Sequence, residues 1–116
     1  MEISVIIRNK TLIAALSGEL DHHSAKEVKS MIEELIKNRG VKNLIFDFSN
    51  LSFMDSSGIG VVIGRYKLIN SIGGKTAIVS HSRNINRLLM MSGINKLIGT
   101  FESVGDALNN VQEGIS

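Results

Sequence analysis

The chain has 116 residues, a length typical of one domain, and the scaling of surface with size indicates that about two-thirds of its surface is buried on folding. It contains no cysteine, which excludes a disulfide framework, a thiolate metal site and a cysteine nucleophile. Thirteen basic and eleven acidic residues give a net charge of +2, and the basic residues are dispersed. With one tyrosine and no tryptophan, this composition argues against a nucleic-acid-binding protein.

The sequence shows no segment directed to a membrane. No apolar stretch approaches the roughly 18 residues that a membrane span needs. Residues 1–4 do not begin a signal peptide, because a basic region and a long apolar region are both missing. The predicted elements leave no long apolar surface. We therefore expect a cytoplasmic monomer, with a single domain over residues 1–116 and no membrane partner.

The N-terminal residues predict a hairpin. Residues 2–8 and 11–17 are rich in Ile, Val and Leu, and the polar pair Asn9-Lys10 between them suits a tight turn. Residues 18–21 then leave the predicted sheet.

A helix follows, beginning at residue 22 or 23 and ending near Asn38, because its apolar residues recur at helical spacing. Two N-cap arrangements compete at its start. In one, Asp21 caps the helix together with Ser24; in the other, Ser24 does so together with Glu27. The sequence leaves both open.

The middle of the chain predicts a buried strand and a second helix. Residues 42–48 contain a continuous apolar run, which is typical of a strand covered on both faces. A loop is predicted over residues 49–55 and a helix over residues 57–71. The apolar stripe of this helix is predicted from Ile59, Val62, Ile63, Tyr66 and Ile69.

Three further elements complete the pattern. Residues 75–80 predict a strand, residues 82–91 a helix and residues 97–101 a short edge strand, and a last helix follows a cap at Ser103. The order ββαβαβαβα predicts an α/β domain with a mixed, mostly parallel sheet. Right-handed crossovers place about four helices outside that sheet.

Two nucleotide-binding motifs are incomplete. Residues 73–76 (GGKT) end like a P-loop, but Ile69 stands where its first glycine is required, and a helix precedes where a strand should. Residues 58–60 (GIG) begin like a dinucleotide-binding motif, but Ile63 occupies its last glycine position. We therefore expect no cofactor.

The residues typical of metal sites and hydrolases do not assemble either. His22 and His23 are adjacent, so on a helix they point about 100° apart and are poor joint ligands of one metal ion. A hydrolase built around Ser57 would need a nucleophile elbow, but Asp55 occupies its first glycine position. We expect no metal site and no catalytic residues, so the protein is not predicted to be an enzyme.

The remaining motif is Asp55-Ser56-Ser57-Gly58, at a predicted strand-to-helix turn. Asp and Ser are favoured N-cap residues, so a purely structural role explains the motif on composition alone. A second role is compatible with the first. A serine at a helix N-terminus faces free backbone N–H groups and the positive end of the helix dipole, so the fold would tolerate a phosphoryl group there.

Residues 51–67 (LSFMDSSGIGVVIGRYK) strongly resemble the anti-sigma factor antagonists, which are small STAS domains. Residues 18–23 (GELDHH) match the other signature loop of this family, and residues 75–80 and 91–93 also fit. The resemblance therefore covers essentially the whole chain and implies a STAS-like fold. It is closest to the antagonists of the sporulation sigma-F system; a general-stress antagonist and a nucleotide-binding STAS domain are the alternatives.

The resemblance implies a partner-switching cycle. The unmodified protein binds an anti-sigma factor that is also a serine kinase, and the sigma factor is released. The kinase uses ATP to phosphorylate Ser57, the second serine of the motif, with Ser56 as the less favoured acceptor. A metal-dependent serine phosphatase restores the unmodified form.

The resemblance also implies a contact surface, provided that the strand ends bring the two signature loops together. Its partner-binding residues are expected to be Asp21, His22, His23, Asp55, Ser56, Ser57, Gly58, Gly60, Val61 and Arg65.

Overall fold

A computed structural model describes residues 1–113 of the chain. Its elements are, in order, β1 (Glu2–Arg8), β2 (Thr11–Leu20), α1 (His22–Asn38), β3 (Asn43–Met54), α2 (Ser56–Ser71), β4 (Thr76–Val79), α3 (Arg83–Ser92), the 3₁₀ turn η1 (Ile94–Lys96), β5 (Gly99–Phe101) and α4 (Val104–Glu113). The predicted order ββαβαβαβα is confirmed, with η1 as the one element that the sequence did not predict.

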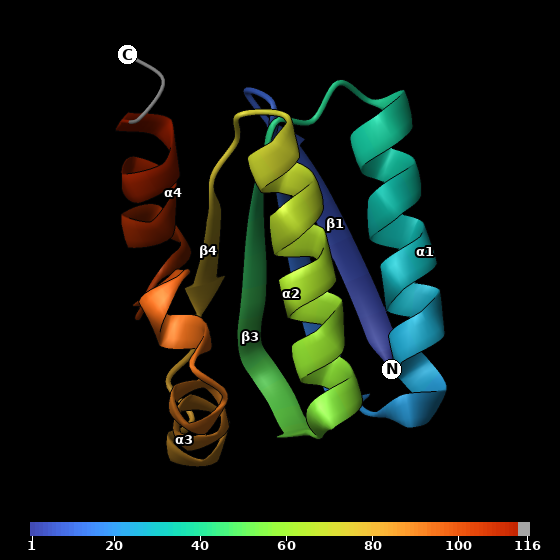
Figure 1. Cartoon of the computed structure of the whole chain (residues 1–116), viewed down its shortest axis with the longest axis vertical. Helices are drawn as coiled ribbons and strands as arrows, with labels where there is room; N and C mark the ends of the chain where they lie inside the picture. Colours follow the sequence, from blue (N-terminus) through green and yellow to red (C-terminus); the bar gives the residue numbers. More distant parts are fainter. Residues whose placement is uncertain (114–116) are drawn as a thin grey trace.

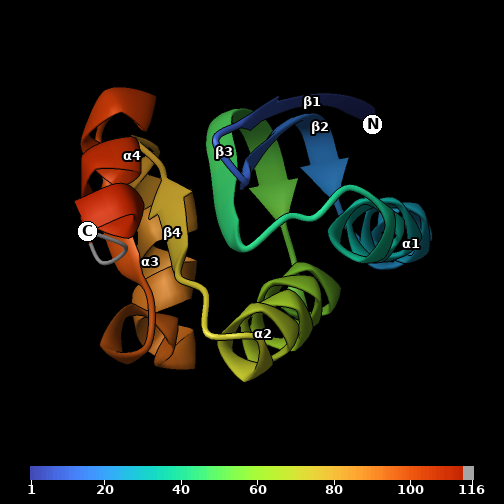
Figure 2. The same ribbon diagram turned by 90° about the horizontal axis from the view of Figure 1, so that it is seen from above.

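The five strands form one sheet in the order β1-β2-β3-β4-β5. β1 pairs with β2 in antiparallel fashion, and the other three pairings are parallel, as the mixed, mostly parallel prediction required. Figure 1 shows α1 and α2 side by side across the sheet, and Figure 2 shows that both lie on the same side of it. In the chain, β2, β3, β4 and β5 are each followed by a helix, in turn α1, α2, α3 and α4. Because these strands are parallel, the four helices start on the side of the sheet edge where the strands end.

Two apolar cores lie on opposite faces of the sheet. Leu12 and Phe46 point to the face covered by α1, α2 and α3, where they pack with residues such as Val28 and Val62. The neighbouring residue Ile45 points to the other face, where α4 covers it. Ile45 and Phe46 are both fully buried, which confirms that this strand is covered on both faces.

The prediction of a loop over residues 49–55 was wrong, as was the end of the second strand at residue 17. β3 continues to Met54 and β2 to Leu20, because the two strands remain paired along this whole stretch. Two irregularities in the pairing, one of them at Gly18, absorb the departures from a regular strand. Gly18 has a φ of +104°, a conformation that other residues rarely adopt.

The predicted apolar stripe of α2 was only partly correct. Val62 and Ile69 are buried, but Val61 and Arg65 are buried as well, while Tyr66 is only partly buried. α2 packs against α1 on one side as well as against the sheet, so its buried face is wider than one stripe. Among residues 1–113, no helix is long and apolar enough to cross a membrane.

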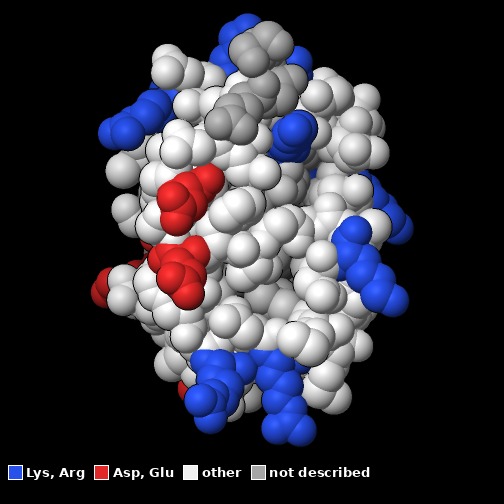
Figure 3. Space-filling model, turned by 90° about the vertical axis from the view of Figure 1, so that its left-hand side faces the viewer, with Lys and Arg blue, Asp and Glu red and all other residues white. Residues whose placement is uncertain are grey.

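The charged residues are unevenly distributed. Residues 56–101 include six basic residues and no acidic one. On the face that carries α3 and α4, basic side chains lie at the lower end, along the right-hand edge and near the top, and acidic side chains lie on the left (Figure 3). α1 and α2 both begin at the lower end (Figure 1), where Asp21 and Asp55 cap them.

Candidate functional site

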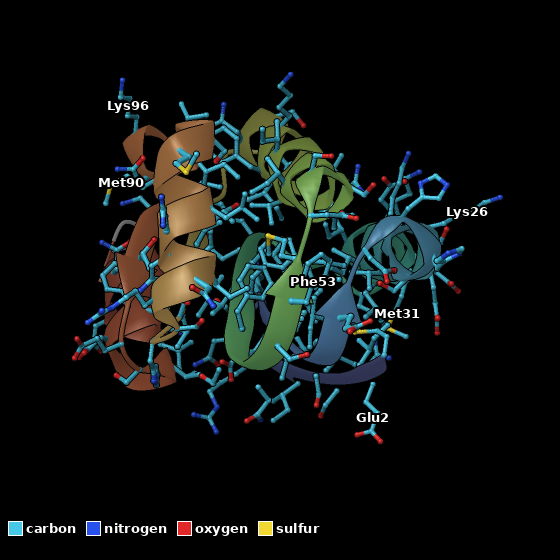
Figure 4. The ribbon with its side chains drawn as sticks, turned by 90° about the horizontal axis from the view of Figure 1, so that it is seen from below. Glu2, Lys26, Met31, Phe53, Met90 and Lys96 are labelled. Carbon is cyan, nitrogen blue, oxygen red and sulfur yellow. The ribbon has the colours of Figure 1, made fainter. Side chains whose placement is uncertain are left out.

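The two signature loops meet where β2 and β3 end. Leu20 pairs with Met54 at the last position of the two strands, and the backbone N–H of Asp55 donates to the Leu20 carbonyl oxygen at 3.3 Å. Because the strands are parallel, α1 and α2 begin next to each other at the same edge of the sheet. Figure 4 views this edge from below. The condition for a shared surface, that the strand ends bring the loops together, is confirmed.

The start of α1 is closed by a capping box. The Oδ1 atom of Asp21 accepts hydrogen bonds from the backbone N–H groups of His23 at 2.9 Å and Ser24 at 3.0 Å. In return, the Asp21 N–H donates to the Ser24 hydroxyl at 3.0 Å. Of the two predicted caps, the structure has the one formed by Asp21 with Ser24. The Ser24 N–H, as the largest of several contributions, lowers the pKa of the Asp21 carboxyl.

The start of α2 is capped by the Asp55 side chain alone, without the reciprocal hydrogen bond found at α1. The Oδ1 atom of Asp55 accepts hydrogen bonds from the backbone N–H groups of Ser57 at 2.8 Å and Gly58 at 3.4 Å. α2 begins at Ser56, one residue earlier than predicted. Ser56 is exposed and Ser57 partly buried, and neither hydroxyl has a hydrogen-bond partner among the described residues.

Gly58 fixes how closely α2 approaches the strand ends. A Cβ atom at this position would lie 2.6 Å from Cγ of Met54 and 3.0 Å from the carbonyl oxygen of Leu20. Only glycine fits such an approach without a shift of its neighbours. Gly58 is therefore buried against Met54 and Leu20 and holds the first turn of α2 close to both strands.

A surface hollow of about 430 Å³ lies between the N-terminal halves of α1 and α2. We call it the α1–α2 hollow. Its lining residues are His22, Ala25, Lys26, Lys29, Ser57, Gly60, Val61 and Arg65. It therefore joins one residue of the first signature loop to four residues of the second.

Three residues of the expected contact surface are buried in the protein. Gly58 is covered as described, Val61 is 4% exposed and Arg65 is 7% exposed. The strand ends cover Gly58, and α1 packs beside α2, so these three residues offer little exposed surface. Val61 and Arg65 line the α1–α2 hollow. The role of all ten predicted residues in partner binding stays a prediction.

Arg65 is held by one ion pair. Its Nη2 atom lies 3.1 Å from Oε2 of Glu33 on α1. Burial lowers the pKa of the Arg65 guanidinium, and the Glu33 carboxylate acts in the opposite direction. The Nε and Nη1 atoms of Arg65 have no hydrogen-bond partner among the described residues.

Sequence reasoning included His22 on the α1 side of this site but missed three other residues of α1. Lys26, Lys29 and Glu33 belong to it, but they stand on the polar face of α1 and carry no motif. Their spacing of three and four residues was a weak signal, because residues so spaced share one face of a helix. Among residues 1–113, no group of three His, Cys, Asp or Glu side chains is placed to hold a metal ion.

A five-stranded mixed sheet with two helix N-termini meeting at one edge, one of them carrying a serine pair, defines an α/β domain of the STAS type. The STAS domain family model matches residues 2–107, and the chain belongs to this family. A relative from Paenibacillus polymyxa, named anti-sigma F factor antagonist, is 39% identical over 97% of this chain and 96% of its own. A second relative of the same name, from Lysinibacillus sphaericus, is 30% identical over 94% of this chain and 95% of its own.

Solved structures agree with this assignment. The anti-sigma factor antagonist SpoIIAA in its unphosphorylated form superposes with a TM-score of 0.77 at 26% identity, over 96% of this chain and 98% of that one. The Bacillus cell fate determinant SpoIIAA in its phosphorylated form gives a TM-score of 0.75 at 29% identity, over 95% and 99%. The chain thus belongs to the family of the anti-sigma factor antagonists and has a fold similar to that of SpoIIAA.

Proposed function

We propose that this chain is the antagonist of a sporulation sigma-F system. In its unmodified form it binds an anti-sigma factor that is also a serine kinase, and the sigma factor is released. The kinase transfers the γ-phosphoryl group of ATP to the Ser57 hydroxyl, and the phosphorylated antagonist dissociates. A metal-dependent serine phosphatase hydrolyses the phosphoserine and restores the binding form.

The observation that carries this proposal is the hydrogen bonding of Ser57. Its backbone N–H is fixed by Asp55 at 2.8 Å, while its hydroxyl has no partner among the described residues and lines the α1–α2 hollow. Ser57 is the second residue of a helix, where the positive end of the helix dipole favours an added anion. A phosphoryl group can therefore be added there without breaking any hydrogen bond of the fold.

The names of two relatives support the choice of a sigma-F system. Two relatives that are 39% and 30% identical over almost the whole chain are both named anti-sigma F factor antagonists, and one SpoIIAA structure carries the phosphorylated form. Sigma factors act on RNA polymerase, so we propose a cytoplasmic protein. We propose that it acts as a monomer without a cofactor and without catalysis of its own.

Electrostatics make phosphorylation an effective switch. Phosphorylation adds about −1.5 to −2 charges. A partner carboxylate about 5 Å from the phosphate would be repelled by roughly 3 kcal/mol per pair of unit charges at an effective dielectric constant near 20. Half of this energy already weakens binding by about tenfold, and the full effect by several hundredfold. That range is sufficient for an exchange of partners.

The test is intact-mass spectrometry after incubation with the anti-sigma F kinase of the same genome and ATP. Wild type and Ser56→Ala should each gain one phosphoryl group, about 80 Da, whereas Ser57→Ala should gain none. Phosphorylation of Ser57→Ala would move the acceptor elsewhere. If wild type reacts only with the kinase of a general-stress system, the chain is the antagonist of that system instead.

A further inference from the structure

A groove lies between α3 and the end of β3. The pairing of β3 with β4 stops at Asp47 and Val79, whereas β3 itself continues to Met54. Among residues 1–113, no strand takes the place of β4 beside this last part of β3, and α3 lies there instead. The space that remains is a groove of about 360 Å³, which we call the β3–α3 groove.

The β3–α3 groove is apolar and open to solvent. Phe53 and Met54 line it from β3, and Ile85, Leu88 and Met91 line it from α3. Phe53 is 47% exposed and Met91 is 74% exposed, so two large apolar side chains face solvent at the same groove. Clustered exposure of this kind is typical of an interaction site, and a methionine side chain adapts its shape to different partners.

The charges beside the groove are positive. Arg87 lines the groove, and Arg83 stands four residues earlier, on the same face of α3. Lys96 follows in η1, and neither α3 nor η1 contains an acidic residue. No described residue that lines the groove is acidic. This charge distribution is complementary to an acidic partner segment and unfavourable for a basic one.

We propose that the β3–α3 groove is a docking site for the anti-sigma kinase, which inserts an apolar side chain flanked by carboxylates. The apolar side chain packs between Phe53 and Met91. The flanking carboxylates pair with Arg87 and Arg83 at the rim of the groove. Burial of the apolar side chain supplies affinity, and the arginines select an acidic segment.

This docking site rests on the proposed function and lies apart from the phosphorylated serine. Phe53 precedes Ser57 by four residues, which span at most about 14 Å, so one protein interface can cover both. None of the ten residues expected to bind a partner lines the groove. A contact made there does not touch the reacting hydroxyl, so its loss should raise the KM for phosphorylation and leave kcat unchanged.

Two neighbouring methionines provide a matched pair of variants. Met91 lines the groove and Met90 does not, although Met90 is also exposed, at 66%. Figure 4 shows Met90 on the side of α3 that points away from β3. In steady-state phosphorylation of Ser57, Met91→Gln should raise the KM by about tenfold at unchanged kcat. Met90→Gln should change neither constant by more than about twofold.

The charge contribution is tested at the rim of the groove. Arg87→Gln should raise the KM by about threefold and make it less sensitive to salt, because a rim charge acts over a distance that salt screens. Arg87→Lys keeps the charge and should stay close to wild type. Urea unfolding of each variant confirms that the fold is retained. A Met91→Gln protein with the KM of wild type, or a Met90→Gln protein impaired as strongly as Met91→Gln, would overturn the docking site.

A second copy of the chain is the alternative occupant of the groove. Sedimentation velocity of the free protein distinguishes it from the kinase. A monomer at all concentrations agrees with the proposal. A wild-type dimer that Met91→Gln dissociates would assign the groove to a second copy and overturn the proposal.

A peptide titration tests the groove without the kinase. Acetyl-Glu-Leu-Leu-Glu-amide is added to protein labelled with ¹³C at the methionine methyl groups, and the methyl shifts are followed by NMR. We expect a saturable shift of Met91, larger than that of Met90, with a Kd on the order of 10 mM. The analogue with lysines in place of the glutamates should bind more weakly.

The two proposals fail in different ways. Failure of the kinase to phosphorylate Ser57 would overturn the proposed function and leave the peptide titration unchanged. Normal phosphorylation of Ser57 without a saturable shift of the Met91 methyl group, or with equal binding of the lysine analogue, would overturn the docking site alone.

Discussion

The starts of α1 and α2 occupy equivalent positions but use their serines differently. Both helices begin at the carboxyl ends of neighbouring parallel strands, and both are capped by an aspartate in extended conformation. At α1, the Ser24 hydroxyl accepts from the Asp21 N–H at 3.0 Å and donates to the Glu19 carbonyl oxygen at 2.7 Å. At α2, the third helical position is Gly58, so no side chain can close the cap in return.

This difference separates Ser24, whose hydroxyl is engaged in the fold, from Ser57, the proposed phosphorylation site. Ser24 is occupied on both sides, and a phosphoryl group on it would break two hydrogen bonds of the fold. Ser57 is held only by its backbone, so its hydroxyl can change without loss of an existing contact. The close approach at Gly58 is what makes the α2 start different, and it is the first feature to test.

Gly58→Ala should have the largest effect. The added Cβ would lie 2.6 Å from Cγ of Met54 and 3.0 Å from the Leu20 carbonyl oxygen, and overpacking of this kind costs about 1–3 kcal/mol. Gly60→Ala is the matched control, since it meets no atom within 4 Å and should add up to about 1 kcal/mol of stability. Urea unfolding measures both free energies. Equal stability of the two variants would contradict the account of Gly58.

Removal of the α2 cap should have the next largest effect. Asp55→Ala leaves the N–H groups of Ser57 and Gly58 without their acceptor and should lower the free energy of unfolding by about 1 kcal/mol, within the 0.5–2 kcal/mol typical of lost caps. Asp55→Asn keeps an acceptor oxygen and should restore most of this loss. The same urea unfolding experiment compares them, and an Asn variant as unstable as the Ala variant would argue against capping.

The two serines provide the sharpest comparison. Ser24→Ala removes both hydrogen bonds of a closed cap and should cost about 0.5–1.5 kcal/mol. Ser57→Ala removes no hydrogen bond of the described structure and should change the stability by less than about 0.5 kcal/mol. Thermal or urea unfolding of the two variants side by side decides the point. A large loss in Ser57→Ala would show that its hydroxyl has a structural role after all.

Alternating strand and helix signals were sufficient to predict the order of the elements. The expected contact surface at the two helix starts came from the resemblance of residues 18–23 and 51–67 to a known family, and its role stays a prediction. The strand ends were predicted less well, because Gly18 is typical of a break and the pairing that carries β2 on to Leu20 is made with β3. Strand length here depends on a partner about 34 residues away in the sequence, which no local pattern encodes.

The burial of residues at the site could not be predicted from the sequence either. A charged residue such as Arg65 is expected to be exposed, and only its contact with Glu33 on another helix allows its burial. The glycines of α2 could not be told apart either. Gly58 is required by the strand ends and Gly60 is not, yet in the sequence both are glycines near a helix start.

The smallest expected effect concerns the carboxyl of Asp21. Its pKa lies below the ordinary 3.8, chiefly because the Ser24 backbone N–H donates to the ionised form, with lesser help from His23 and the Ser24 hydroxyl against the opposing effect of burial. A pKa that is lower in the folded state stabilises the fold above the unfolded value, and this contribution is lost as the pH falls through the folded pKa. The α1 start should therefore loosen only in acid, below about pH 4.

A ¹³C NMR titration of the Asp21 carboxyl between pH 2 and 6 measures this shift directly. Ser24→Ala should raise the pKa only partly, since the backbone N–H of residue 24 remains as donor and only the hydroxyl is lost. Asp21→Asn should make the stability of the protein less sensitive to pH below 4, because an amide does not titrate. A carboxyl that titrates at or above 3.8 in the wild type would mean that the closed cap does not hold the charge, and the contrast between the two helix starts would then rest on the serine hydroxyls alone.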